Sequence, residues 1–444
     1  MHILIDSGSY HCGNVGDVAM LQAALERLRG LWPQASIGVV TNAPAALASC
    51  CPGVQPVPVA GRITFVTDRF LGRVDRLLPR RVSHTLAATE ARLRHQWPAV
   101  VASMIGSKRA LALRPDHAAP RAYVDALKRA DLVLVTGAGV FTDAFADNAM
   151  GVLATLEYAA EWNIPTAALG QGFGPVGNRA LLTRMAEVLP RVDLIAVREE
   201  RESVRLLESA GVSRHRIVVT GDDAIDMANR SAAAEAGLVI GVNIRIASYA
   251  GMNGSMIDSV GSALRAAAGR LRACLVSVPI AYHSDCSDGA AIQQLLVSDA
   301  DGAPSAVGLE QPVTVISRIS RCRIMVTGSY HGAVFALAQG IPVVAIAGSQ
   351  YYVNKFAGLS QLFDGGCEIV MIDTPDTRAV LERAINRAWT NAPRWREPLL
   401  RAARRQVERG KAAYRRLGMI VDASCAGRAP HRDTPRAAAL PHDV

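Results

Sequence analysis

The sequence predicts an α/β protein built from two domains, each with a mainly parallel sheet. Short apolar runs typical of buried parallel strands alternate with helical patterns along most of the chain. The 444 residues are too many for one ordinary hydrophobic core, and two domains of about two hundred residues each are expected. The composition changes in the alanine-rich stretch 231–237, where we place the boundary. We expect one domain over 1–228 and another over 237–392.

The first strand leads into a loop that suits ligand binding. The predicted strand 2–8 is followed by Asn14, Gly16 and Asp17 and then by an amphipathic helix. Gly16 lets the backbone turn tightly, while Asn14 and Asp17 can cap the helix or touch a ligand hydroxyl. For Asp17 alone, the helix cap is the favoured interpretation.

The rest of the first half repeats this arrangement. The stretch 52–120 has no clear period, and we expect one or two helices there, which could form a mobile flap. Beyond it, strands end near Asp143, Gly172 and Arg198. Arg198 either meets substrate as a cation or pairs with Glu202 one turn later. The strands predicted in this half are 2–8, 36–40, 131–137, 165–170, 193–199 and 216–226.

In the second half, a strand, loop and helix around His331 organise the chain. His331 follows the apolar strand 324–327 and opens a helix that should end at Gly340. Its loop would lie over the carboxyl edge of the sheet, where α/β proteins bind ligands. Arg245 and His283 also follow strands. The other strands predicted here are 238–245, 273–280, 343–347 and 367–372.

After these strands the chain becomes basic. A helix is predicted at 377–389, a separate basic helix lies within 393–420, and the segment 424–444 has the composition of a disordered tail. Arginines also gather over 62–94. The net charge of +9 favours solvated helix faces first. Attraction to an anionic substrate, an acidic polymer or an anionic membrane surface is the alternative, and no nucleic-acid signature accompanies the charge.

Composition excludes several classes of protein. The eight cysteines form no metal-binding pattern and indicate reduced thiols in the cytoplasm, so no metal is expected. His283 and Asp285 alone are too few ligands for a zinc site. The chain enters its first strand without a signal-peptide pattern, and we expect no membrane-spanning helix.

Several motifs together resemble one family. They are NVGDVAML, TGAGVFTD, GQGFGP, VREERESVRLLESAG, GDDAID, GSYHGAVFALAQGIPVV and YYVNKF. From residue 9 to about 366 the chain resembles the polysaccharide pyruvyl transferases. The resemblance implies two Rossmann-like domains facing a cleft, as in GT-B glycosyltransferases. It also implies transfer of a pyruvyl group from phosphoenolpyruvate to two sugar hydroxyls, which makes a ketal, releases phosphate and needs no further cofactor.

The resemblance also suggests roles for individual residues. His331 matches the family histidine and is expected to act as a general acid or phosphate ligand. Lys355 and Arg198 match cations for the donor, while Asp17 and Asp143 are candidates to hold or deprotonate sugar hydroxyls. The other residues expected to contact substrate are Asn14, Gly16, Gly172, Arg245, His283, Ser329 and Tyr352.

One position departs from the family pattern. Many members carry an arginine two positions before the histidine, whereas this chain has Ser329, which cannot supply a charged clamp. Either Arg245 or Lys355 takes over, or the donor differs. Three hypotheses follow: a pyruvyl transferase acting on a glycan or lipid-linked precursor, a nucleotide-sugar glycosyltransferase, and a non-catalytic glycan- or phosphate-binding relative.

Overall fold

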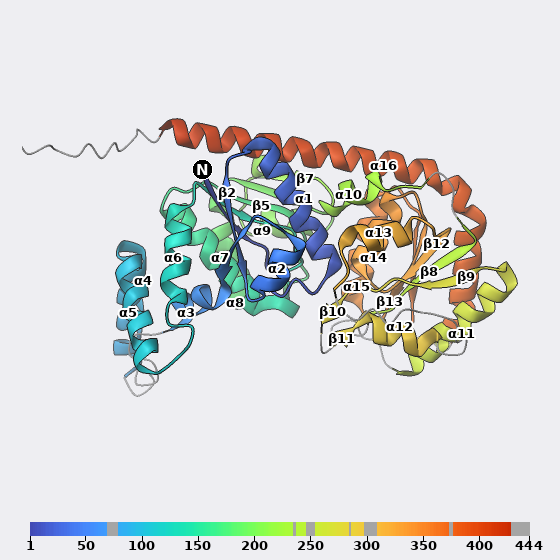
Figure 1. The fold of residues 1–444 in the computed structure, drawn as a ribbon, viewed down its shortest axis with the longest axis horizontal. Coiled ribbons are helices and arrows are strands. Elements are labelled where there is room, and N and C mark those ends of the chain that lie inside the picture. Colours follow the sequence, from blue (N-terminus) through green and yellow to red (C-terminus); the bar gives the residue numbers. More distant parts are fainter. Residues whose placement is uncertain are drawn as a thin grey trace, which may run out of the picture.

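The computed structural model describes residues 1–68, 79–233, 237–245, 254–283, 286–296, 309–372 and 376–427. Two parallel sheets with packed helices form two halves, and one long helix runs over both (Figure 1). The predicted α/β fold with two sheets is therefore confirmed. Arg69, Arg73, Arg76, Asp285, the His283 side chain and the tail beyond 427 lie outside the described residues.

The first sheet has seven parallel strands in the order β3-β2-β1-β4-β5-β6-β7. The order reverses between β1 and β4, so the loops after these strands diverge and leave a crevice at the carboxyl edge. The strands are β1 His2–Asp6, β2 Ser36–Thr41, β3 Gln55–Pro58, β4 Leu132–Val135, β5 Thr166–Gln171, β6 Leu194–Val197 and β7 Ile217–Val219.

The helices of this half include three where only one or two were expected. α3, α4 and α5 all lie within 52–120, because apolar residues on both sides of α5 hide its helical period. The helices are α1 Val15–Leu31, α2 Pro44–Cys50, α3 Val59–Thr67, α4 Arg80–Gln96, α5 Pro98–Leu111, α6 Ala119–Arg129, α7 Ala146–Glu161, α8 Arg179–Val188, α9 Ser203–Ser209 and α10 Ala224–Arg230, with short 3-10 turns η2 Asp143–Phe145, η3 Leu189–Arg191 and η4 Arg214–Arg216.

The second sheet has five parallel strands in the order β14-β13-β12-β8-β9, and its order reverses between β8 and β12. Its strands are β8 Val239–Asn243, β9 Cys274–Ser277, β12 Ile324–Thr327, β13 Val343–Ala347 and β14 Cys367–Met371, beside a small antiparallel pair, β10 Tyr282–His283 and β11 Cys286–Ser287. Its helices are α11 Gly254–Leu271, α12 Asp288–Leu296, α13 Pro312–Ile319, α14 Tyr330–Ala338 and α15 Gln350–Leu362.

Helix α14 holds the two halves together from within. Every residue from His331 to Ala338 is buried, in a core that also contains Val15 and Ala19 of α1. The cluster continues into α10, α13 and α15. The start of α1 and the start of α14 are therefore fixed next to one another.

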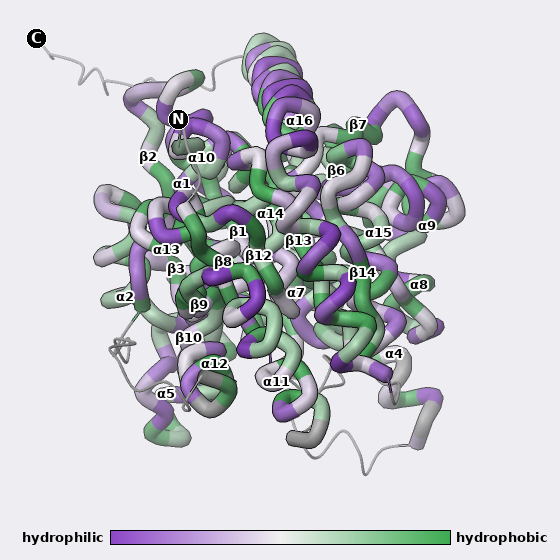
Figure 2. Tube along the Cα trace, turned by 90° about the vertical axis from the view of Figure 1, so that its right-hand side faces the viewer, coloured by the Kyte–Doolittle hydropathy of each residue, from purple (hydrophilic) through white to green (hydrophobic). Residues whose placement is uncertain are grey.

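The final helix, α16 Thr377–Gly427, is continuous where two helices were predicted. Pro393 and Pro398 lie inside it and would end an isolated helix. Burial outweighs that local cost: Leu399 packs on the second half, and Tyr414 packs beside α1. Figure 2 shows α16 at the outside of the molecule, with hydrophilic stretches along it and hydrophobic strands beneath.

Candidate active site

A small pocket lies between the two halves. The first half contributes the loops after β4, β5 and β6, and the second contributes the starts of α14 and α15. The pocket measures about 40 Å³, enough for a few water molecules only. Its lining residues are Gly139, Thr142, Gly172, Phe173, Gly174, Pro175, Arg198, Glu199, Glu202, Tyr330, Tyr351, Asn354 and Lys355.

Arg198 supplies one cation to this pocket. Its guanidinium donates to the carbonyl of Gly170 over 2.7 Å and lies over the ring of Tyr330 at 5.2 Å. Its Nε is 3.1 Å from Oδ2 of Asp222. The predicted alternative, a pair with Glu202, is therefore wrong: the charge partner comes from the turn after β7. Burial lowers the pKa of Arg198, but Asp222, together with Tyr330, Asp17 and Tyr351, more than offsets burial and raises it.

Lys355 supplies the second cation, from α15. Its ammonium lies 4.3 Å from the centre of the Tyr351 ring and 5.9 Å from that of Tyr330. Burial, and then the nearby Arg198, lower the pKa of Lys355 to about 7, although Asp17 opposes the shift. An anion bound in the pocket would restore this charge.

His331 lies behind the pocket wall, next to the lining residue Tyr330. Its side chain is 8% exposed, and its Nε2 is 3.7 Å from Oδ2 of Asp222. Burial, followed by Arg198 and Lys355, lowers the pKa of His331 well below its usual value. The imidazole is therefore neutral at pH 7, as expected near two cations and a helix N-terminus.

Gly16 makes room for this imidazole. A Cβ atom on Gly16 would lie 1.9 Å from Cγ of His331, so no larger residue fits without displacing the ring. Two residues earlier, Asn14 caps α1 by accepting from the amides of Gly16 and Asp17. The interpretation of Asp17 as the cap is therefore wrong, and its carboxylate instead acts on the pKa values of Arg198 and Lys355.

Asp222 completes the polar group. Its Oδ1 accepts from the amide of Ala224, whereas Oδ2 faces both Arg198 and His331. Burial raises the pKa of Asp222 to about 6, although Arg198 lowers it. Oδ2 of Asp222 and Nε2 of His331 have no hydrogen-bond partner among the described residues. Two such buried atoms facing one another provide a place for a proton to be held.

Other predicted residues lie elsewhere. The carboxylate of Asp143 is exposed and accepts from the amides of Gly177 and Asn178, which fixes a loop. Arg245 pairs with Asp288 at 3.1 Å beneath the turn that contains Gly328. Neither residue lines the pocket.

Three further positions have mainly structural surroundings. Ser329 caps α14 by accepting from the amide of Gly332 at 3.5 Å. Tyr352 is buried against Phe356, and its neighbour Tyr351 lines the pocket instead. His283 belongs to β10, whose neighbour Ala281 forms a bridge to Asn14.

Several site residues were missed from sequence. Asp222 and Asn354 both lie in motifs that carried the resemblance, GDDAID and YYVNKF, and that was the available signal. Asn354 donates to Glu202 over 2.7 Å and so joins the two halves at the pocket. Among the described residues, no group of histidines, cysteines and carboxylates could hold a metal ion, and no helix is long and apolar enough to cross a bilayer.

The fold is a two-domain α/β architecture of the GT-B type, which several solved sugar enzymes share. A UDP-GlcNAc 2-epimerase from Methanocaldococcus jannaschii superposes with a TM-score of 0.54 and 9% identity, over 95% of this chain and 100% of that one. The UDP-GlcNAc 2-epimerase from Neisseria meningitidis bound to UDP-GlcNAc superposes with a TM-score of 0.53 and 14% identity, over 96% of this chain and 100% of that one. The glycotransferase of kitacinnamycin superposes with a TM-score of 0.50 and 14% identity, over 95% of this chain and 98% of that one. Identities this low show the fold alone.

The family of this protein is identified from its sequence. The polysaccharide pyruvyl transferase model matches residues 14–350, well over half of the chain. The protein therefore belongs to the polysaccharide pyruvyl transferase family, which confirms the resemblance and implies a transferase. No curated protein matches the chain closely enough to count as a relative.

Proposed function

We propose that this protein transfers a pyruvyl group from phosphoenolpyruvate to two hydroxyls of a glycan or glycan precursor. The methylene carbon of the donor gains a proton and becomes a methyl group. The former enol carbon forms two C–O bonds to the sugar and loses phosphate. The observation that carries the proposal is the pair of cations, buried Arg198 and half-buried Lys355, at one pocket beside a neutral imidazole in a chain of this family.

The two cations suit the donor's two anionic groups. Arg198 is held by Gly170 and Asp222, so its guanidinium is oriented before any ligand arrives. Lys355 has a pKa of about 7 in the empty pocket, and a phosphate beside it would raise that pKa. Donor binding therefore charges the residue that binds it. In this proposal Arg198 and Lys355 supply the positive charge of the arginine that many family members carry at the position of Ser329.

His331 suits a proton transfer in two steps. As a neutral base it takes the proton of the attacking hydroxyl, and as an imidazolium it gives that proton to the methylene carbon. Asp222, 3.7 Å away, stabilises the imidazolium between these steps. The second hydroxyl loses its proton to the departing phosphate, which balances the reaction.

The pocket must widen for this reaction. Its volume of about 40 Å³ is far below the roughly 300 Å³ at which small-molecule sites begin. His331 also has to be reached from the pocket, past Tyr330. We propose that the halves separate at the contact between Asn354 and Glu202 when substrates enter.

The acceptor is proposed to be a glycan or a lipid-linked sugar, and the compartment the cytoplasm. Seven of the eight cysteines are free thiols among the side chains that the structure describes, which supports a reducing compartment. Asp17 lies beside the two cations and remains our candidate to hold an acceptor hydroxyl. Asp143 is tied to a loop and is a weaker candidate.

Incubation with phosphoenolpyruvate and a panel of glycans tests the proposal. Phosphate release should depend on the glycan, and His331→Ala should lower kcat by at least about a hundredfold. Thermal stabilisation by phosphoenolpyruvate should accompany turnover. If a nucleotide sugar stabilises the protein and phosphoenolpyruvate does not, the glycosyltransferase hypothesis suggested by Ser329 replaces this one. Binding without turnover over the whole panel would support a non-catalytic relative.

A further inference from the structure

Exposed apolar side chains gather in one part of the molecule. Thirteen large hydrophobic residues are exposed among the described residues, and eight of these lie between 63 and 113. They are Ile63, Val82, Leu93, Trp97, Val100, Met104, Leu111 and Leu113. Soluble monomers rarely leave so many apolar side chains together in water unless a partner covers them.

Helix α5 is the centre of this group, because apolar side chains extend from its buried side onto a neighbouring exposed side. Val101 and Ile105 are buried in the core with α3 and α6. On the other side, Val100 and Met104 are about half exposed, and Leu111 is 87% exposed. The apolar stripe of a helix in a globular protein normally faces the core. In α5 only part of the apolar surface does so, and Val100, Met104 and Leu111 remain outside the core.

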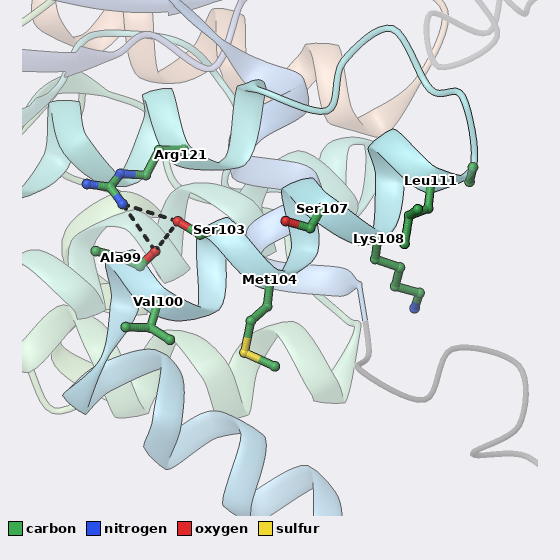
Figure 3. A pocket seen from close by; sticks show the side chains of 9 residues that line it. Ala99, Val100, Ser103, Met104, Ser107, Lys108, Leu111 and Arg121 are labelled. Carbon is green, nitrogen blue, oxygen red and sulfur yellow. Dashed lines mark hydrogen bonds between the residues drawn. The ribbon is translucent and has the colours of Figure 1, made fainter.

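The outer side presents a continuous surface. We define the α5 face as Trp97, Val100, Met104 and Leu111, which follow one another at roughly helical spacing, together with Leu113 just beyond the end of the helix. Figure 3 shows Val100, Met104 and Leu111 along α5, beside Lys108. A hollow of about 870 Å³ runs along this face.

Arg121 of α6 anchors the helix next to the face. It donates to the carbonyl of Ala99 and to the hydroxyl of Ser103, over 3.5 and 3.1 Å (Figure 3). These bonds, together with the buried inner side, hold α5 in place. The apolar side chains are therefore presented on a fixed helix.

The same segment is strongly basic. Residues 80–114 contain seven arginines and lysines and one acidic residue, Glu90, which leaves +6 of the chain's +9. Glu90 is buried and lies 3.7 Å from Arg94. The exposed cations are Arg81, Arg92, Lys108 and Arg114. Arg109 is half-buried and pairs with Asp68 and Asp116.

We infer that the α5 face docks onto an anionic phospholipid membrane. Exposed apolar side chains on a fixed helix, with a tryptophan at one end and cations around them, match the chemistry of an interfacial helix. Each exposed cation near an anionic surface adds to the attraction. The inference does not depend on the reaction proposed above.

Two other arrangements fit less well. A symmetric contact between two copies would bring the two basic segments together, and their like charges would repel. The basic helix α16 has only one exposed large hydrophobic residue among those described, Met419, because its apolar side packs on both halves. It can be attracted to a membrane but has little to insert.

Vesicle sedimentation tests the inference. The full chain should bind vesicles of phosphatidylcholine mixed equally with phosphatidylglycerol, bind pure phosphatidylcholine at least about tenfold more weakly, and lose affinity as salt is raised. The double variant Met104→Glu/Leu111→Glu should lower affinity for the anionic vesicles at least about tenfold. Met419→Glu, which adds one negative charge to α16 at an exposed methionine, should leave affinity within about twofold.

Fluorescence adds a readout that folding alone would not change. Trp97 is 60% exposed, so vesicles should shift the emission to shorter wavelength, and Trp97→Phe should abolish most of the shift. Absence of binding by the wild-type chain, or equal binding by the double variant, would overturn the inference. A dimer that the double variant dissociates, without any vesicle binding, would show that the face joins two copies instead.

Discussion

Nε2 of His331 lies 3.7 Å from Oδ2 of Asp222, and neither atom has a hydrogen-bond partner among the described residues. The two side chains come from different halves of the molecule. Burial lowers the pKa of His331 and raises that of Asp222 to about 6. At neutral pH the pair is a neutral imidazole facing a carboxylate that Arg198 keeps charged. A proton arriving at His331 would therefore be stabilised at once.

Asp222→Asn should remove that stabilisation. We expect kcat to fall by about a hundredfold, because the imidazolium would form beside Arg198 and Lys355 without a counter-charge. The rate should also become less dependent on pH near 6. Rates of phosphate release from phosphoenolpyruvate across the pH range measure both effects.

Asp226→Asn is the matched control for this prediction. Asp226 lies on the same segment but pairs with Arg27 at 3.4 Å, so its loss should leave kcat within about twofold. Equal activity of the two variants would remove Asp222 from the proton transfer.

Gly16→Ala should displace the imidazole. The new Cβ would lie 1.9 Å from Cγ of His331, so the ring or the start of α1 must move. We expect about 1–3 kcal/mol of destabilisation, typical of overpacking, and at least tenfold lower kcat. Urea unfolding and kinetics on the same preparation provide the two numbers.

Gly30→Ala in the same helix provides the comparison. No atom lies within 4 Å of its added methyl, so a gain of up to about 1 kcal/mol is expected from helix propensity alone. If Gly16→Ala behaves in the same way as Gly30→Ala, the close contact with His331 is not real.

Local sequence patterns predicted the strands and helices that carry this site, but not which charged side chains pair within it. The strand 343–347 and the helix start at His331 were recognised because strand and helix periods are properties of neighbouring residues. The partner of Arg198 was not recognised, because Asp222 lies in the turn after the next strand. Spacing along the sequence indicates only Glu202, four residues away.

The choice between neighbouring residues on a helix was also beyond the sequence. Tyr351 and Tyr352 occupy consecutive positions of α15, and the way α15 packs decides that Tyr351 meets the pocket while Tyr352 enters the core. Likewise, nothing local to α16 shows that its prolines are tolerated. That follows from the burial of residues such as Leu399 on the second half.

Ser329→Ala should affect stability more than donor binding. Ser329 caps α14 with a long hydrogen bond to Gly332, so we expect a loss of about 0.5–1 kcal/mol. The KM for phosphoenolpyruvate should stay within about twofold, since Arg198 and Lys355 supply the charge in this proposal. Thermal unfolding and steady-state kinetics measure the two effects. A KM raised tenfold with unchanged stability would instead make the serine a donor ligand.

Lys355→Met should stabilise the protein while abolishing donor binding. Burial lowers the pKa of Lys355 to about 7, so the unfolded chain holds this proton more tightly than the folded one. The cost to folding is complete below about pH 7, declines as pH rises, and vanishes near the ordinary lysine pKa of about 10.4. The methionine variant should gain on the order of 5 kcal/mol below about pH 7 and little near pH 10.

The affinity of the wild-type protein for phosphoenolpyruvate should also depend on pH, through the same titration of Lys355. Because an anion raises the pKa of Lys355, binding takes up a proton, and affinity should fall up to about tenfold per pH unit above 7. Calorimetric titration with phosphoenolpyruvate in buffers of different ionisation enthalpy measures that uptake. Lys128→Met, at an exposed lysine, should change neither stability nor uptake. If Lys355→Met still binds the donor with wild-type affinity and pH dependence, the buried ammonium is a structural feature and another cation holds the phosphate.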